Sequence, residues 1–226
     1  MIKKIPLPFF LLLIIACSSP RSAEDTTEQA ASDTEQTDAE EKVKTILFFG
    51  NSITAGYQLD MDQAFPAVIQ DRLDSLELPY QTINAGLSGE TSAGGKSRIE
   101  WVLRTIPDIF VLELGANDGL RGLSLDETYQ NLQDILDQVK KANPDVEIII
   151  AGMMVPPNLG ADYSKQFQDI FPKLAEANDA VLIPFILEGV AGNRDLNLSD
   201  GIHPTPEGHQ IVAETVWDYL APLVLK

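Results

Sequence analysis

Cysteine and histidine are scarce in this chain of 226 residues, which contains one cysteine and two histidines. A single cysteine, Cys17, cannot form an intramolecular disulfide. A site that needs a histidine base must use His203 or His209. Basic residues are also few, since 16 Lys and Arg face 34 Asp and Glu and give a net charge of −18. This charge repels phosphate backbones, so we expect no nucleic-acid partner.

The apolar run near the N-terminus, residues 7–16, is too short to span a bilayer as a helix. It follows two lysines, as in a secretory signal peptide. The run ends in the letters IIAC, which resemble a bacterial lipobox. We predict that residues 1–17 are a lipoprotein signal peptide, and that Cys17 is lipidated and anchors the protein in the bacterial cell envelope after secretion across the inner membrane. The alternative is an ordinary signal peptide that is cleaved nearby.

The stretch over residues 18–44 has no aromatic residue and almost no large aliphatic one, so it cannot bury a core. We interpret it as a disordered acidic tether that holds a folded domain away from a membrane. A linker without a spacing role is the alternative. Residues 45–226 contain no internal repeat and no second shift in composition. This length and the hydrophobic content of the whole chain, 44%, suit one globular domain.

Short apolar segments alternate with segments of helical period along this domain, a pattern typical of βαβ units around a parallel sheet. The predicted strands are Thr45 to Phe49, Tyr80 to Asn84, Ile109 to Leu114, Val146 to Ala151 and Ala180 to Ile183. Two apolar stripes predict core-facing helices. One consists of Phe65, Val68, Ile69, Leu73 and Leu76, and the other of Tyr129, Leu132, Leu136 and Val139.

A serine becomes a good nucleophile only when a base takes its proton and a third group orients that base. Ser52 follows the first predicted strand, at the edge of an open α/β sheet where ligands bind. Taken alone, a serine there is more often a helix cap. However, His203 follows Asp200 by three residues in a loop rich in Gly and Pro, and can reach that carboxylate. His209 is interpreted as a packing or helix-surface residue. The two histidines lack the spacing of a metal site, so we predict no metal and no cofactor.

Four segments together resemble the SGNH or GDSL hydrolases, in particular the secreted bacterial group with arylesterase, lysophospholipase and acyl-CoA thioesterase activities. They are Gly50-Asn51-Ser52-Ile53-Thr54, Asn84-Ala85-Gly86-Leu87-Ser88-Gly89-Glu90-Thr91, Gly115-Ala116-Asn117-Asp118 and Asp200-Gly201-Ile202-His203-Pro204. The resemblance implies a flavodoxin-like three-layer α/β/α sandwich with a five-stranded parallel sheet. It also implies Ser52 as nucleophile, His203 as base and Asp200 as acid. The implied oxyanion hole consists of the backbone N–H groups of Ser52 and Gly89 and the side-chain amide of Asn117.

One departure from the family concerns Asn51, because the first block usually reads Gly-Asp-Ser. An Asn side chain can accept hydrogen bonds in the same turn, so we expect the local geometry to survive and the charge near Ser52 to differ. The chain also lacks the Gly-x-Ser-x-Gly elbow of the α/β-hydrolase fold.

The substrate groove is predicted from residues after the third and fourth strands, with a surface connection as the alternative. The residues proposed to line it are Leu120, Arg121, Leu123 and Pro156. The leading hypothesis is a lipid-anchored serine esterase acting on a small acyl ester, such as an aryl ester, a lysophospholipid or an acyl thioester. The alternatives are a carbohydrate O-deacetylase and a non-catalytic binding lipoprotein or nucleotide binder on the same fold. The sequence makes no prediction of oligomeric state.

Overall fold

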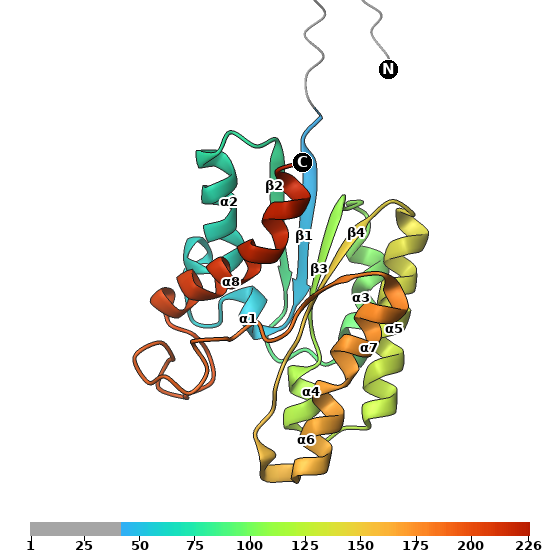
Figure 1. Cartoon of the computed structure of the whole chain (residues 1–226), viewed down its shortest axis with the longest axis vertical. Helices are drawn as coiled ribbons and strands as arrows, with labels where there is room; N and C mark the ends of the chain where they lie inside the picture. Colours follow the sequence, from blue (N-terminus) through green and yellow to red (C-terminus); the bar gives the residue numbers. More distant parts are fainter. Residues whose placement is uncertain (1–41) are drawn as a thin grey trace, which may run out of the picture. The chain divides into compact units, whose positions relative to one another are not determined.

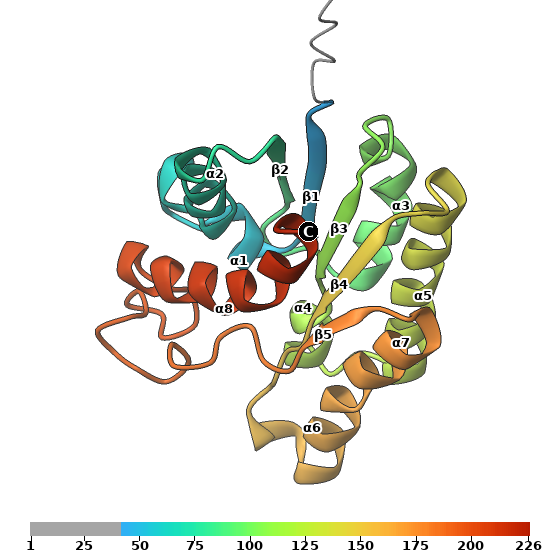
Figure 2. The same ribbon diagram turned by 45° about the horizontal axis from the view of Figure 1, so that its top comes forward.

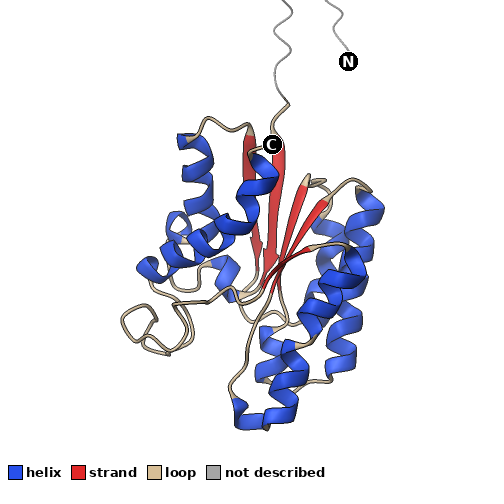
Figure 3. Ribbon diagram, viewed as in Figure 1, coloured by secondary structure: helices blue, strands red, loops and turns tan. Residues whose placement is uncertain are grey.

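Five parallel strands lie at the centre of the computed structural model, which describes residues 42–226 (Figures 1 and 3). They are β1 (Lys44–Gly50), β2 (Tyr80–Gly86), β3 (Ile109–Glu113), β4 (Glu147–Ala151) and β5 (Val181–Ile183). Their order across the sheet is β2-β1-β3-β4-β5. This is the flavodoxin-like order, in which the chain passes from β1 outward to β2 and then crosses back to β3, so that the strand order reverses between β1 and β3. The predicted fold class and all five predicted strands are confirmed.

Burial explains why strands such as β1 could be predicted from the sequence. In β1, residues 46–50 are buried without alternation because helices cover both faces of the sheet. At the carboxyl end of β1, Gly50 lies opposite Gly86 on one side and Glu113 on the other. The residues that follow these strand ends therefore meet at one edge of the sheet.

Helices form a layer on each face of the sheet, as Figure 2 shows. On one face α2 (Phe65–Ser75) packs against α8 (Pro206–Val224). On the other face α5 (Leu125–Ala142) packs against both α3 (Ser92–Val102) and α7 (Ile170–Asn178). The shorter elements are α1 (Ser52–Ala55), η1 (Met61–Gln63), α4 (Ala116–Leu120), η2 (Pro157–Leu159) and α6 (Ala161–Gln168).

Both predicted apolar stripes lie on helices, α2 and α5, and face the core along most of their length. In α2, Phe65, Ile69 and Leu73 are buried, and Val68 is partly buried. Leu76 was wrongly placed on this buried face and is 48% exposed. It forms the C-cap of α2, where the helical repeat ends and the side chain turns toward solvent.

The hydrophobic core draws its residues from Ile46 to Val224, so residues 42–226 contain a complete core of their own. Within that range, no helix is both long and apolar enough to cross a membrane. The predicted signal peptide, Cys17 and nearly all of the predicted tether lie outside the described residues. The division of the chain at residues 17 and 44 stays a prediction.

Candidate active site

The turn after β1 presents Ser52 at the start of α1. Asn51 caps this helix, since its Oδ1 accepts a hydrogen bond from the Ile53 N–H at 3.1 Å. Ser52 is therefore the first residue of the helix and not its cap. Its hydroxyl is left to interact with other groups, and the residue is 9% exposed at the wall of a cavity.

Ser52, His203 and Asp200 form a chain of hydrogen bonds. Ser52 Oγ lies 2.8 Å from His203 Nε2, and His203 Nδ1 lies 2.7 Å from Asp200 Oδ2. Both contacts are satisfied when Nδ1 carries the proton, so that Nε2 accepts from the Ser52 hydroxyl. The fold thus brings together two residues that are 151 positions apart in the chain.

The loop that carries Asp200 fixes this carboxylate from its other side. Asp200 Oδ1 accepts hydrogen bonds from the backbone N–H groups of Ile202 and His203, at 2.9 and 3.0 Å. Partial burial works to raise the pKa of Asp200, but the hydrogen bonds from the His203 side chain and from these two N–H groups outweigh it and lower the pKa to about 2. Asp200 is therefore ionised at neutral pH and can stabilise a protonated His203.

Tyr57 packs against the ring of His203, with 4.3 Å between the ring centroids. Its backbone N–H also donates to the carbonyl of Ser52, at 3.0 Å. Tyr57 thus connects the turn that carries Ser52 to the imidazole and restricts how the ring can rotate. Sequence reasoning missed this residue, whose only signal was an aromatic side chain five positions after Ser52.

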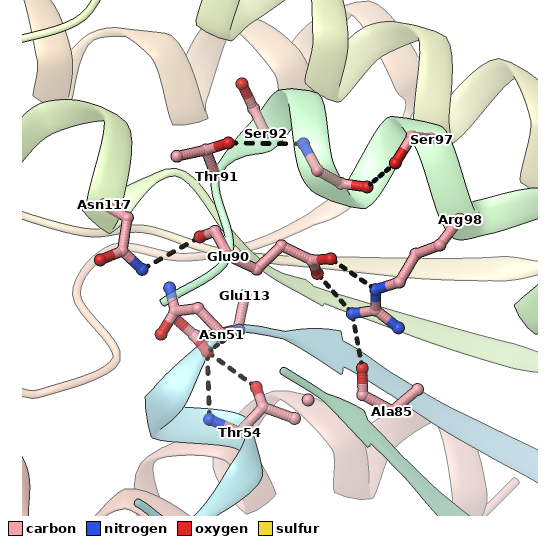
Figure 4. A network of polar contacts seen from close by, with 12 residues as sticks. Asn51, Thr54, Ala85, Glu90, Thr91, Ser92, Ser97, Arg98, Glu113 and Asn117 are labelled. Carbon is pink, nitrogen blue, oxygen red and sulfur yellow. Dashed lines mark hydrogen bonds and ion pairs between the residues drawn. The ribbon is translucent and has the colours of Figure 1, made fainter. Parts of the chain in front are cut away.

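Hydrogen bonds join the loop that carries Gly89 to helix α4, which carries Asn117, as Figure 4 shows for Asn117. The Asn117 Nδ2 donates one hydrogen bond to the backbone carbonyl of Glu90, at 3.0 Å, which leaves its second N–H available. Arg121 donates to the carbonyl of Gly89 at 2.9 Å. Gly89 has φ of +80°, a conformation that favours glycine. Asn117 lines the same cavity as Ser52, whereas Gly89 does not.

A buried ion pair supports the loop that carries Gly89. The side chain of Glu90 is 4% exposed and pairs with Arg98, whose Nε donates at 2.6 Å. Arg98 also donates to the carbonyl of Ala85, near the end of β2 (Figure 4). Its guanidinium group lies over the ring of Phe49, at 4.2 Å from the ring centroid. The pair therefore connects the loop to the sheet and to α3. Sequence reasoning did not identify it.

Glu113, at the end of β3, lies fully buried beneath the turn that carries Ser52 (Figure 4). Its Oε2 accepts from the Thr54 hydroxyl at 2.8 Å, from the Thr54 N–H at 3.1 Å and from the Asn51 N–H at 3.2 Å. Gly50 leaves room for this carboxylate, because a Cβ there would lie 2.6 Å from Glu113 Oε2. Glu113 therefore holds the backbone on both sides of Ser52.

Two polar atoms next to this turn are buried without a hydrogen-bond partner among the described residues, Asn51 Nδ2 and Glu113 Oε1. Burial raises the pKa of Glu113 to about 7, although hydrogen bonds from Thr54 and Asn51 work in the opposite direction. A carboxyl group that titrates near neutral pH thus lies directly behind the candidate nucleophile.

The cavity in front of Ser52 and His203 has a volume of about 460 Å³ and a largely apolar lining. Leu120 and Pro156 line it, as predicted for a groove, whereas Arg121 and Leu123 do not. Lining residues that the sequence did not single out for the groove include Phe185, Leu187 and Ile202. All three come from segments that follow β5. Ile202 lies in the block with Asp200 and His203, whereas no motif marks Phe185 and Leu187.

His209 takes no part in this site. Its Nδ1 accepts a hydrogen bond from the Phe65 N–H at 3.2 Å, and the ring stacks on Phe65. Burial lowers the pKa of His209 to about 4, so the ring is neutral. The interpretation of His209 as a packing residue is confirmed. Residues 42–226 contain no cluster of three His, Cys, Asp or Glu side chains that could hold a metal ion.

Comparison with known proteins finds a match to the model of the GDSL-like Lipase/Acylhydrolase family over residues 48–211. Esterase TesA of Pseudomonas aeruginosa is 36% identical over 182 residues, which cover 80% of this chain and 90% of that protein. Thioesterase 1/protease 1/lysophospholipase L1 of Escherichia coli K12 is 38% identical over 181 residues, 80% of this chain and 85% of that protein. A crystal structure of TesA superposes with a TM-score of 0.76 at 36% identity, covering 80% of this chain and 99% of that one.

Proposed function

Because the chain belongs to the GDSL-like lipase/acylhydrolase family and is a hydrolase of ester bonds, we propose that Ser52, His203 and Asp200 are its catalytic residues. The observation that carries the proposal is the hydrogen-bond chain from Ser52 Oγ through the His203 ring to Asp200, with contacts of 2.8 and 2.7 Å. This is the geometry that nucleophilic catalysis by a serine needs.

In the first half of the reaction, Ser52 Oγ attacks the carbonyl carbon of the ester while His203 Nε2 takes the hydroxyl proton. The tetrahedral intermediate collapses when His203 gives this proton to the departing alcohol or thiol, which leaves an acyl group on Ser52. In the second half, His203 takes a proton from water, and the resulting hydroxide attacks the acyl group. The acid leaves as Oγ recovers its proton. Asp200 stabilises the protonated ring in both halves.

The oxyanion hole is proposed to consist of three N–H donors. As the first residue of α1, Ser52 has an N–H without an intrahelical acceptor. The second donor is the N–H of Gly89, and the third is the free hydrogen on Asn117 Nδ2. These donors would stabilise the negative charge that forms on the carbonyl oxygen of the substrate. Loss of one such donor typically slows an enzyme by about 10²- to 10³-fold.

The acyl part of the substrate is assigned to the apolar cavity of about 460 Å³, with Leu120 and Pro156 in its wall. An apolar cavity favours an acyl chain over a polar substituent because it removes apolar surface from water. The substrate class is therefore a carboxylic ester with an aliphatic acyl group, in the form of an aryl ester, a thioester or a lysophospholipid.

Replacement of Ser52 tests the proposal. We expect Ser52→Ala to lower kcat on a short-chain aryl ester by several orders of magnitude and to abolish labelling by a fluorophosphonate probe. Ser97→Ala, an exposed serine on α3, is the matched control and should keep both properties. Labelling of the Ser52→Ala protein would reject Ser52 as nucleophile. A folded wild-type protein without labelling or turnover would instead favour a non-catalytic binding lipoprotein.

Faster hydrolysis of an acetylated oligosaccharide than of any acyl lipid would favour the carbohydrate O-deacetylase. That result would also contradict the proposal that the cavity binds an acyl chain.

A further inference from the structure

Exposed apolar side chains gather around the mouth of the catalytic cavity. Of the twelve large apolar side chains that are exposed among the described residues, five lie there, each 41–50% exposed. These five, called the mouth rim below, are Leu120, Leu123, Met154, Leu159 and Ile202. A group of exposed apolar side chains in one place is a feature of surfaces that bind something.

The mouth rim continues the lining of the cavity outward. Leu120, Met154 and Ile202 line the cavity that contains Ser52 and His203, so their exposed parts form its entrance. On the same side, a Cβ on Gly122 would lie 3.3 Å from Leu159, which places η2 against the loop between α4 and α5.

The hydroxyl of Tyr163 donates to the carbonyl of Leu123 at 2.9 Å, so α6, which follows η2, is joined to the same loop. Leu123 and Leu159 therefore extend the entrance without lining the cavity.

The charge around the mouth rim differs from that of the rest of the molecule. Residues 152–161 contain no charged side chain, although 50 of the 226 residues are charged (16 basic and 34 acidic). Arg121, between Leu120 and Leu123, donates a hydrogen bond to the carbonyl of Gly89. The net charge of −18 repels an anionic surface. The rim segment with Met154 and Leu159 carries no charge, and the charges beside the other rim residues, on Arg121 and Asp200, are of opposite sign. The rim therefore matches a surface that is apolar below and electrically neutral above.

We propose that the mouth rim docks on a zwitterionic lipid surface, and that the enzyme takes its ester directly from this surface into the cavity. The proposal rests on the proposed function and narrows its substrate to aggregated, single-chain acyl esters such as lysophospholipids. A lipid that leaves an aggregate through water must expose its acyl chain, at a cost that grows with every methylene group. Contact between the rim and the aggregate removes this step, since the chain passes from one apolar environment to another.

Kinetics across the critical micelle concentration of lysophosphatidylcholine test the proposal. The protein used begins at Ser18, because residues 42–226 contain the whole core. We expect the wild-type rate to rise when micelles form. Leu159→Asp should lower the micellar rate by about tenfold, because the new charge cannot enter the lipid interface. Its rate on soluble p-nitrophenyl acetate should stay within about twofold of wild type.

Two variants serve as controls. Leu225→Asp changes another exposed leucine, near the C-terminus and away from the cavity, and should behave as wild type on both substrates. Leu159→Met keeps an apolar side chain and should keep the micellar rate. Equal rates of Leu159→Asp and wild type on micelles would overturn the proposal, as would a wild-type rate that does not change when micelles form.

Binding separates this proposal from the proposed function. The Ser52→Ala protein lacks the proposed nucleophile but keeps the rim, and we expect it to co-sediment with phosphatidylcholine vesicles and not with phosphatidylglycerol vesicles. Co-sedimentation without any ester hydrolysis by wild type would mean that docking is right and the catalytic assignment is wrong. Sedimentation of the wild-type protein as a dimer that Leu159→Asp dissociates would mean that the rim binds a second copy instead of lipid.

Discussion

Asn51 occupies a position where the family usually has Asp, and its surroundings give a physical reason for an amide. An Asp carboxylate would cap α1 as well as the Asn oxygen does, so capping does not explain the exchange. The difference lies behind the turn, where Glu113 is fully buried. Two carboxyl groups in one buried place hinder each other's ionisation, whereas an amide beside a carboxylate does not. The neutral Asn51 thus permits Glu113 to ionise and to hold Thr54 and the backbone of the turn.

Asn51→Asp should make stability depend more strongly on pH. The pKa of Glu113 is about 7 in the folded protein against 4.5 for a free side chain, so the folded protein keeps a proton that the unfolded chain releases. The free energy of unfolding therefore falls as pH rises from about 4.5 to 7, by roughly 3 kcal/mol for this group. A second carboxyl beside it should steepen this fall, and denaturant unfolding at several pH values would measure it.

Glu113→Gln provides the matched control for this prediction. It removes the titrating group, so its unfolding free energy should vary less with pH than that of wild type. Parallel curves for wild type, Asn51→Asp and Glu113→Gln would show that Glu113 does not titrate in this range. The interpretation of Asn51 would then be wrong.

At the scale of the elements, apolar runs and motifs predict the strands and the residues that follow them, but not the contacts between distant segments. β1, β3 and β4 were predictable because each is a short apolar run that is mostly buried. β2 and β5 are only partly buried and were predicted from their short apolar runs alone. The proximity of Ser52 and His203 could be predicted because each residue lies in a recognisable sequence motif. The contact of Tyr57 with His203 could not be predicted, because it exists only after α1 and the last loop have been brought together by the fold.

The lining of the cavity likewise depends on contacts in the fold that the local sequence does not reveal. Leu120 lines the cavity, whereas Leu123, three positions later, lies outside it. Leu120 is the last residue of α4 and Leu123 lies in the loop that follows, but both are leucines, so residue type cannot separate them. The direction of the chain after α4 decides which of the two faces the cavity.

The ion pair of Glu90 and Arg98 gives a prediction at the scale of two elements, the loop with Gly89 and α3. Arg98→Met leaves the Glu90 carboxylate buried and unpaired, and we expect a loss of about 3 kcal/mol in the free energy of unfolding. The Gly89 N–H should then be poorly positioned, so kcat should fall by roughly tenfold with KM nearly unchanged. Steady-state kinetics on an aryl ester and denaturant unfolding would measure both effects.

Arg98→Lys separates a positioning role from a purely structural one. Lysine keeps the charge but cannot contact both Glu90 oxygens and the Ala85 carbonyl as the guanidinium does. We expect stability to recover more fully than kcat. A variant in which stability falls while kcat stays at the wild-type value would show that the pair supports the fold and not the oxyanion hole.

At the scale of the whole molecule, the chain enters the fold at the edge of the sheet opposite the candidate active site (Figure 1). β1 begins at Lys44 and ends next to Ser52. The last residue, Lys226, pairs with Glu147 at the start of β4, so the C-terminus also lies away from the site. An attachment at the N-terminus would therefore leave the cavity and the mouth rim free to meet substrate.

The predicted attachment is a lipid on Cys17, and the protein's only cysteine makes it directly testable. Cells supplied with radiolabelled palmitate should label the wild-type protein and not Cys17→Ser, and the mature wild-type protein should begin at residue 17. The rate of the isolated chain from Ser18 on a soluble ester should equal that of the wild-type protein, because the whole core lies between Ile46 and Val224. An unlabelled wild-type protein whose mature N-terminus lies elsewhere would instead indicate an ordinary signal peptide. Docking through the mouth rim would then have to hold the enzyme at a lipid surface without an anchor.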